Sequence, residues 1–348
     1  MAQPVIQPKW KVVEYPRSQI INAGRIIRQE NSSKEAIMQS TEIIDNWRAA
    51  HAFPLHVIYI HLRRMCAANT NAVVAERLKR LDSIIGKLRR EQSMNLWTMQ
   101  DLGGCRVIVP NIQDVYDYFE KYDKSKKRHI FKRKYDYIKN PKESGYRSLH
   151  AVYEYRSDKN KTYNKNMLVE IQFRTHLQHL WATAVETMDL FTKESIKSGF
   201  GSEDVKRFFV LVSALFAKKE GQPLPPNVID DQDEIVSEIE SLNSIHNYLG
   251  ILSGIRVAVD NQKAKVSNVA YYILILDYSK KSLQIVAFGA SQIEQANTIY
   301  NSIEATRAEK KIDAVLVRVS SFNTLKKAYP NYFSDIGEFV RLVRGYLR

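Results

Sequence analysis

Apolar side chains recur with a helical period over most of the first 90 residues. In the segment 71–90, NAVVAERLKRLDSIIGKLRR, the periodic apolar positions are Leu78, Leu81, Ile84, Ile85 and Leu88. A spacing of three to four residues places such side chains on one face of a helix. The segment 32–50 opens with two serines followed by a glutamate, which is typical of a helix start. We therefore expect a helical N-terminal part that includes residues 71–90.

After residue 100 the pattern becomes that of strands mixed with helices. In the segment 167–175, apolar Val169, Ile171 and Phe173 alternate with polar residues, which is the period of a half-buried strand. The predicted strands are 105–110, 147–156 and 167–175, and the predicted helices are 114–122 and 177–191. The pattern predicts an α/β (α+β) fold in which a mixed sheet is flanked by helices.

The composition changes near residue 220, where three prolines and a glycine precede an acidic run in the segment 218–234. Such a segment is typical of a domain boundary. We expect a first domain at 1–220, a linker with an acidic helix at 221–258 (the helix at about 230–254), and a small α+β domain at 259–348. The elements predicted in this last part are strands 271–277, 282–288 and 314–319, a turn at 278–281, and helices 291–309, 322–329 and 333–347.

The chain is basic, with a formal net charge of +14 in 348 residues. Between Lys121 and Lys142, ten Lys or Arg residues stand against two acids, and four aromatic residues lie among them. Basic residues interleaved with aromatics suit contacts with phosphates and bases, so a polyanion such as a nucleotide or RNA is the expected partner. A solvated basic surface is the alternative.

Other features of the sequence limit the class of protein. There are only two cysteines, Cys66 and Cys105, too few for a zinc ribbon or a disulfide framework. No apolar run is long enough to span a membrane, and the N-terminus lacks the apolar core of a signal peptide. We therefore expect a cytoplasmic protein that does not bind membranes.

Two carboxylates are candidates for a magnesium site. Asp101 precedes one predicted strand, and Glu170 lies on the polar side of another. Hard oxygen ligands at two strand edges suit Mg²⁺, and Mg²⁺ beside Lys and Arg is the usual equipment for phosphoryl transfer. On the helix predicted before Asp101, one face would carry a strip suited to a triphosphate, formed by Lys79, Ser83, Lys87 and Arg90. Two acids that merely lie near strand ends remain the alternative.

Three ordered motifs resemble the RelA/SpoT-type synthetase domain, namely MQDLGGCRVIV (99–109), NPKESGYRSLH (140–150) and VEIQFRT (169–175). With the upstream segments 17–27 and 46–58, the resemblance covers about residues 11–219. It implies a nucleotidyltransferase-like core that transfers pyrophosphate from ATP to a ribose hydroxyl with Mg²⁺. It also implies a chain that only synthesises, because no His-Asp dipeptide of the family's hydrolase domain occurs.

The resemblance implies roles for individual residues. Asp101 would hold Mg²⁺, and Glu170 would complete the metal site or act as general base. Arg77 and Arg106 would sandwich the adenine of ATP. The full implied ATP-binding set is Arg77, Lys79, Ser83, Lys87, Arg90 and Arg106. The implied acceptor side has Tyr146 stacking on the acceptor base, with contacts from Lys142, Arg147, His150 and Gln172. The family often has Glu-His where this chain has Glu186-Thr187. This departure puts one contact to the site residues in question, but not the implied reaction.

The C-terminal part contains the segment KKAYPNYFSDI (326–336). A basic synthetase followed by a small α+β domain with such a Tyr-Pro-Asn-Tyr segment resembles the CapRel family, the fused toxin–antitoxins of phage defence. That resemblance implies a zinc-finger-like C-terminal fold without zinc ligands, whose Tyr329 and Tyr332 block the ATP site at rest. A phage capsid protein would release the block, and the first domain would then pyrophosphorylate the 3′ CCA end of tRNA and stop translation. The RNA contacts expected in that case are Lys126, Lys127, Arg128, Lys132, Arg133 and Lys134.

Two other functions stay open at this point. The same catalytic residues would serve an alarmone synthetase that makes (p)ppGpp or (p)ppApp from ATP and a guanine or adenine nucleotide. A catalytically inactive RNA-binding or phage-sensing module is the third possibility, although intact Asp101 and Glu170 argue against it. His176 and His179 are expected to be structural, because no third metal ligand accompanies them.

Overall fold

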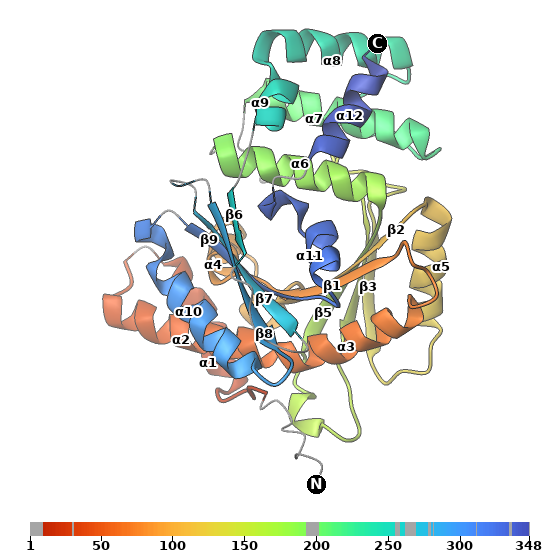
Figure 1. Ribbon diagram of the computed structural model, residues 1–348. Helices are drawn as coiled ribbons and strands as arrows, with labels where there is room; N and C mark the ends of the chain where they lie inside the picture. Colours follow the sequence, from red (N-terminus) through yellow and green to blue (C-terminus); the bar gives the residue numbers. More distant parts are fainter. Residues whose placement is uncertain are drawn as a thin grey trace.

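One mixed sheet runs through the molecule. The computed structural model describes residues 10–29, 31–192, 202–254, 258–261, 269–277, 280, 282–310, 312–333 and 336–347. Nine strands are hydrogen-bonded in the order β3-β4-β5-β2-β1-β9-β7-β8-β6, and helices cover both faces (Figure 1). The strands are β1 Val73–Leu78, β2 Gly103–Val109, β3 Ile130–Asp136, β4 Leu149–Glu154, β5 Leu168–Thr175, β6 Ala258–Asn261, β7 Val269–Asp277, β8 Ser282–Gly289 and β9 Ile312–Arg318.

The helices frame this sheet on three sides (Figure 1). Those before the sheet's second strand are α1 Arg17–Arg28, α2 Lys34–Ala50, α3 Ala52–Met65 and α4 Leu81–Arg90. Those that follow are α5 Ile112–Asp123, α6 His176–Thr192, α7 Glu203–Lys219, α8 Gln232–His246, α9 Tyr248–Gly254, α10 Ile293–Lys310, α11 Phe322–Ala328 and α12 Gly337–Tyr346. The 3₁₀ turns among the described residues are η1 Leu96–Thr98, η2 Lys161–Tyr163 and η4 Pro330–Tyr332. None of the helices in the described part is long and apolar enough to cross a membrane.

The register of the central strands puts the polar candidates on one face. Residues directly opposite each other in paired strands point to the same side of a sheet. Gly104 of β2 lies opposite Arg77 of β1 and opposite Glu170 of β5. Two residues further along β2, Arg106 lies opposite Gln172.

The pairing continues outward from Gln172 to His150 of β4 and from His150 to Tyr135 of the edge strand β3. All of these side chains therefore share one side of the sheet, which we call the polar face. The opposite face packs against α3 and α5 through a buried apolar core that includes Val107, Ile171 and Phe173.

The helix predicted at residues 71–90 was wrong over its first part. Residues 73–78 form strand β1, which pairs with β2 along its whole length, and only residues from Leu81 onward are helical. The apolar run Val73, Val74 and Ala75 fits both a helix and a strand, and its position between β2 and β9 decides for the strand. The polar strand β3, which the sequence pattern did not predict, forms one edge of the sheet.

The C-terminal strands continue the same sheet. Strand β9 pairs antiparallel with β1 at Glu76–Arg318 and Arg77–Val317, and β7 pairs with β9. The segment that contains α11 packs on the polar face, in a core that joins Ala75 and Ile108 of the first strands to residues of β7 and β9. The boundaries predicted at residues 220 and 258 and the zinc-finger-like fold stay predictions.

The segment that follows the predicted boundary at residue 220 is not one continuous helix. The acidic helix expected at about 230–254 is two helices, because Asn247 takes the left-handed conformation (φ 51°) and ends α8 before α9 begins. Asp231 caps α8 by accepting from the backbone amides of Asp233 and Glu234. Of the turn expected at 278–281, only Lys280 lies within the described residues.

Candidate active site

A cavity of about 1190 Å³ lies over the polar face. Its floor includes Arg77, Arg106, His150, Glu170 and Gln172 of the sheet, and its walls include residues of α6 and α7. Most of the residues that the sequence singled out thus meet in one place.

Asp101 sits in a cationic environment at the edge of the cavity. Lys79 Nζ lies 2.9 Å from Asp101 Oδ2, and Lys87 Nζ lies 3.3 Å from Oδ1. Burial by itself would raise the pKa of Asp101, but these two ammonium groups hold it below its ordinary value. Asp101 is therefore ionised, and both lysines point at the same carboxylate.

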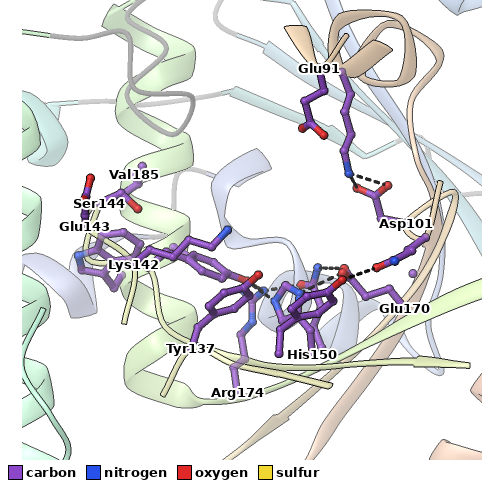
Figure 2. A pocket seen from close by; sticks show the side chains of 18 of the residues that line it. Glu91, Asp101, Tyr137, Lys142, Glu143, Ser144, His150, Glu170, Arg174 and Val185 are labelled. Atoms are coloured by element: carbon purple, nitrogen blue, oxygen red, sulfur yellow. Dashed lines mark hydrogen bonds and ion pairs between the residues drawn. The ribbon is translucent and has the colours of Figure 1, made fainter. Parts of the chain in front are cut away.

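Glu170 is the second carboxylate of the site, and like Asp101 it is half-buried (Figure 2). Its Oε1 lies 3.0 Å from His150 Nδ1, and its Oε2 accepts a hydrogen bond of 2.7 Å from Gln172 Nε2. Burial favours the neutral acid, yet the charge and hydrogen bond of His150 lower the pKa of Glu170 to about 2. Burial likewise disfavours the charged form of His150, but Tyr146 and Glu170 raise the pKa of His150 to about 9. The two groups form an ion pair.

The chain of contacts continues to the loop before β4. The hydroxyl of Tyr146 lies 2.8 Å from His150 Nε2 and accepts a hydrogen bond of 3.2 Å from Arg174 Nη2. Figure 2 shows Tyr137, Lys142, His150 and Arg174 gathered on one side of the cavity and Asp101 on the other, with Glu170 between them. Tyr146 is thus held by two polar side chains that also belong to the sheet.

The two carboxylates fit a magnesium site whose coordination shell would be completed by a substrate. The negative charge of Glu170 raises the pKa of Asp101, and the charge of Lys79 lowers the pKa of Glu170, so all three groups interact. Within the described ranges, no group of three or more His, Cys, Asp or Glu side chains is arranged around a common metal position. Mg²⁺ commonly binds one or two carboxylates together with water and substrate phosphates, which is what Asp101 and Glu170 offer.

The residues expected to bind ATP divide into two groups. Arg77, Lys79, Lys87 and Arg106 line the cavity. Ser83 and Arg90 are exposed on α4 and do not line it. The helical strip was wrong for Lys79, because α4 begins only at Leu81 and Lys79 precedes it. The expectation that Ser83 and Arg90 bind ATP stays a prediction.

Arg106 is covered by the C-terminal segment. Its guanidinium carbon lies 5.8 Å from the centre of the Tyr329 ring, and its Nη1 donates a hydrogen bond of 3.0 Å to the carbonyl oxygen of Ala328. Burial and the positive charges of Arg174 and Arg77 lower the pKa of Arg106 to about 10. The ring of Tyr329 is buried, and its hydroxyl donates to the backbone oxygen of Glu76 at 3.4 Å.

Tyr332 is fastened beside Tyr329 by a buried polar group. Its hydroxyl donates to Asp313 Oδ2 at 3.0 Å and accepts from Arg80 Nη2 at 2.5 Å. Arg80 also pairs with Asp313 at 2.7 Å. Arg80 follows β1, whereas Asp313 belongs to β9, so this cluster ties the C-terminal segment to both halves of the sheet.

The loop of residues 140–148, which we call the β4 loop because it precedes β4, is shaped by Gly145 and held by α7. Gly145 has φ +82°, and its carbonyl oxygen accepts a hydrogen bond of 2.6 Å from Ser213 Oγ. A Cβ atom at this position would lie 3.0 Å from Ser213 Cβ and 3.2 Å from Trp181. Lys142 of the same loop points over the rings of Tyr137 and Tyr146, at 4.4 and 5.6 Å.

Arg147 does not lie where the sequence placed it. It does not line the cavity, and it is 3% exposed, with Nη1 3.9 Å from Glu220 Oε2 at the end of α7. The expectation that Arg147 supplies charge near the phosphates was therefore wrong. Alternation explains this outcome, because Arg147 and Tyr146 are neighbours in an extended segment and point in opposite directions.

The basic residues expected to contact RNA are also divided. Lys126, Arg128, Lys132, Arg133 and Lys134 are exposed, and Arg133 lines the cavity. The expectation that Lys127 contacts RNA was wrong, because its side chain is 7% exposed and its ammonium group donates to the carbonyl oxygens of Tyr122 and Asp123. Its Nζ also lies 5.1 Å from the rings of Tyr122 and Tyr153, so Lys127 stabilises the α5–β3 turn.

Sequence reasoning missed Arg174 and Ser213. Arg174 follows Glu170 and Gln172 at the same two-residue spacing, so strand alternation alone could have placed it on the polar face. No local signal points to Ser213, because α7 lies 68 residues beyond the loop whose backbone it holds.

Two histidines of α6 hold the C-terminal segment on either side of Tyr329. His179 Nε2 lies 2.9 Å from the carbonyl oxygen of Lys327, and His176 Nε2 lies 3.0 Å from Glu338 Oε2. The carbonyl can only accept, so His179 carries its proton on Nε2. Burial, together with the positive charges of Arg106 and Arg174, lowers the pKa of His179 well below its ordinary value.

Substitution of Gly145 should distort the β4 loop. Gly145→Ala places a side chain in the left-handed region and against Ser213, so we expect a loss of about 1–3 kcal/mol in the free energy of unfolding. Gly86→Ala is the matched control, because nothing lies within 4 Å of its added Cβ and it should stabilise α4 by about 0.5–1 kcal/mol. Urea denaturation measures both values, and equal effects of the two substitutions would contradict the constraint.

Neutral, buried His179 should make stability depend on pH. Because its folded-state pKa is depressed, only the unfolded state takes up a proton below about pH 6.5, and stability falls as the pH falls. His179→Gln keeps a donor for the Lys327 carbonyl but cannot titrate. Between pH 7.5 and 5.5 the wild type should lose about 1.4 kcal/mol more than this variant. Parallel unfolding curves at the two pH values would rule out this contribution.

Part of the chain matches a known family. Residues 76–194 match the family described as a region found in RelA / SpoT proteins. The chain is 35% identical over 118 residues to the GTP pyrophosphokinase YjbM of Bacillus subtilis (strain 168), covering 33% of this chain and 55% of that protein. It is 33% identical over 113 residues to the GTP pyrophosphokinase YwaC of the same organism, covering 31% and 52%. The chain thus spans about half the length of these relatives.

Two solved structures are similar to part of this chain. Small alarmone synthetase 1 from Bacillus subtilis bound to its product pppGpp is 26% identical, with a TM-score of 0.42, and covers 49% of this chain and 89% of its own. A GTP pyrophosphokinase family protein from Streptococcus pneumoniae is 24% identical, with a TM-score of 0.41, and covers 56% and 93%. Residues 76–194, which supply Asp101, Glu170 and most of the cavity floor, are the part of this chain that carries the RelA/SpoT region.

Proposed function

We propose that this chain is a pyrophosphokinase that transfers the β,γ-pyrophosphate of ATP to a ribose hydroxyl. The observation that carries the proposal is the placement of Asp101 and Glu170 over one face of the sheet, between a cationic side and an aromatic side. Arg77, Arg106 and the two lysines on Asp101 form the cationic side. The names of the relatives as GTP pyrophosphokinases support the same reaction class.

The order of the strands suggests where each substrate binds. From β1 to β3 the polar face presents Arg77, Arg106, Glu170, His150 and Tyr135 in that lateral order. Cations on β1 and β2 suit the base and phosphates of ATP. The aromatic loop beyond β4 suits the acceptor base. Glu170 lies between the two, where the bond must form.

In the proposed reaction, the acceptor hydroxyl oxygen attacks the β-phosphorus of ATP, and the bond from that phosphorus to the α,β-bridging oxygen breaks. AMP leaves, and the hydroxyl proton passes to Glu170. Mg²⁺ held by Asp101 and Glu170 would neutralise charge on the transferred phosphates. Lys79 and Lys87 hold the phosphates on the Asp101 side, because their ammonium groups already converge there.

His150 orients Glu170 in this scheme. The imidazolium holds one carboxylate oxygen at 3.0 Å and the hydroxyl of Tyr146 at 2.8 Å. It therefore couples the position of the base to the position of the stacking ring. Gln172 holds the second oxygen of Glu170 and is itself contacted by Arg174, which also reaches Tyr146.

The acceptor that we propose is the 3′ CCA end of tRNA. Five of the six basic residues expected to contact RNA are exposed, and Arg133 among them lines the cavity. A free nucleotide offers few phosphates, whereas an acceptor stem offers many to such a surface. The second candidate is alarmone synthesis from a guanine nucleotide, which the names of the relatives favour.

We also propose that the C-terminal segment inhibits the enzyme. Arg106 cannot stack on adenine while the ring of Tyr329 lies over its guanidinium and the Ala328 carbonyl binds its Nη1. The Arg80–Asp313–Tyr332 cluster holds the segment in this position. Release by a phage capsid protein, leading to translation arrest in phage defence, stays a prediction from the resemblance to CapRel.

The acceptor can be identified by a transfer assay. The full chain carrying Tyr329→Ala, to release the segment, is incubated with γ-labelled ATP, Mg²⁺, deacylated tRNA and GDP. We expect label on the tRNA 3′ end, and about a 100-fold or greater loss of transfer with Asp101→Ala or Glu170→Gln. Asp117→Ala, an exposed acid on α5, is the control. Label on GDP alone would select alarmone synthesis, and label on neither acceptor would reject the pyrophosphokinase proposal.

Inhibition by the C-terminal segment can be measured as ATP affinity. Tyr329→Ala removes the ring from Arg106, so we expect at least about tenfold tighter ATP binding by isothermal titration, because the competent state is no longer rare. Tyr300→Ala, which removes an equally buried tyrosine of α10, controls for general loosening and should leave the affinity near that of the wild type. Equal ATP affinities of the wild type and Tyr329→Ala would exclude the block.

A further inference from the structure

We propose that the wall of the cavity formed by β3 is a track for the single-stranded 3′ end of a nucleic acid. In this track, Tyr137 and Tyr135 bind the nucleotides that precede the one on Tyr146. The inference rests on the proposed function, and it names residues and a minimum acceptor length that the proposed function does not include.

Three tyrosines line this wall in succession. The ring centres of Tyr146 and Tyr137 are 6.0 Å apart with planes at 66°, and those of Tyr137 and Tyr135 are 6.0 Å apart with planes at 4°. All three side chains line the cavity. Tyr146 belongs to the loop before β4, Tyr137 directly follows β3, and Tyr135 belongs to β3.

The two added tyrosines differ from the core tyrosines of the same region. Tyr122 and Tyr153 are fully buried on the opposite face, where they pack against each other. Tyr135 and Tyr137 are only half-buried, and the hydroxyl of Tyr135 donates to Gln100 Oε1 beside the catalytic carboxylate at 3.2 Å. Packing of the sheet therefore does not require these two rings, whereas a ligand in the cavity would meet them.

Cations lie beside two of these rings. Lys142 Nζ is 4.4 Å from the centre of the Tyr137 ring, and Arg133 Nη1 lies 3.5 Å from the hydroxyl of Tyr135. Both side chains line the cavity. Lys132 and Lys134 do not belong to this wall, because Lys132 pairs with Glu154 at 3.2 Å and Lys134 Nζ lies 5.4 Å from the centre of the Phe119 ring, on the opposite face. Aromatic platforms that alternate with Lys and Arg are the general solution for binding single strands without reading their sequence.

The arrangement predicts a dependence on acceptor length. A mononucleotide reaches only Tyr146, whereas a strand with two unpaired nucleotides before its terminal ribose also covers Tyr137 and Tyr135. The single-stranded CCA end of a tRNA meets that requirement, and a fully paired end does not, because its bases are stacked on one another.

The test measures binding of two RNA hairpins to the full-length chain. One hairpin ends in a single-stranded 3′ ACCA, and the other is blunt. Tyr135→Leu and Tyr137→Leu should each weaken binding of the first hairpin by about ten- to a hundredfold and leave binding of the blunt hairpin unchanged. Tyr135→Phe and Tyr137→Phe keep the stacking surface and should stay within about twofold of the wild type.

Each outcome decides the proposal. Wild-type affinity of both Leu variants for the overhang, or no preference of the wild type for the overhang, would overturn the track. The transfer assay separates this failure from that of the proposed function. Label on tRNA with unaffected Leu variants removes the track alone, whereas label on GDP and none on tRNA removes the tRNA acceptor and the track together.

Discussion

The compensation of two half-buried carboxylates by neighbouring cations is the constraint on which the rest of the site depends. Asp101 and Glu170 line one cavity, and the charge of Glu170 disfavours ionisation of Asp101. Lys79 and Lys87 stabilise the first, and His150 stabilises the second. Removing a cation would leave the charge of a half-buried carboxylate uncompensated, so the lysines contribute to stability whatever ligand they bind.

The sheet makes this compensation possible by its register. Strand β2 pairs parallel with β5. Strand β1 pairs antiparallel with β2, and β4 pairs antiparallel with β5, so residues from four strands share the polar face. A shift of one residue in any pair would turn the charged side chains into the apolar core under α3 and α5. The apolar residues of the opposite face therefore hold the polar residues in register.

Arg106 connects the cavity to the C-terminal segment. In the proposed function the same guanidinium serves ATP in one state and Tyr329 in the other, so the two ligands exclude each other. The contacts that hold the segment come from both sides, through Arg80 and Asp313 beneath it and through His176 and His179 of α6 above it. Since β9 extends the sheet from β1, the segment is part of the same layer as the site that it covers.

The sequence by itself determined much of the chemistry and the secondary structure. Strand alternation identified β5 with Glu170 and Gln172 on its polar side, and the ordered motifs identified Asp101, Tyr146 and His150, all of which line one cavity. These inferences held because a period of two and a short motif depend only on neighbouring residues. The helix and strand pattern of the C-terminal part held for the same reason.

Only the tertiary structure decided the assignments that depend on distant partners. Residues 73–78 are a strand because β2 and β9 flank them. Lys79 therefore does not share a helix with Ser83 and Arg90, as the sequence pattern had predicted. Arg147 and Lys127 are buried against Glu220 and the α5 carbonyl groups, which no local pattern reveals. Periodicity says which residues share a face, but only packing across the sheet says what each face meets.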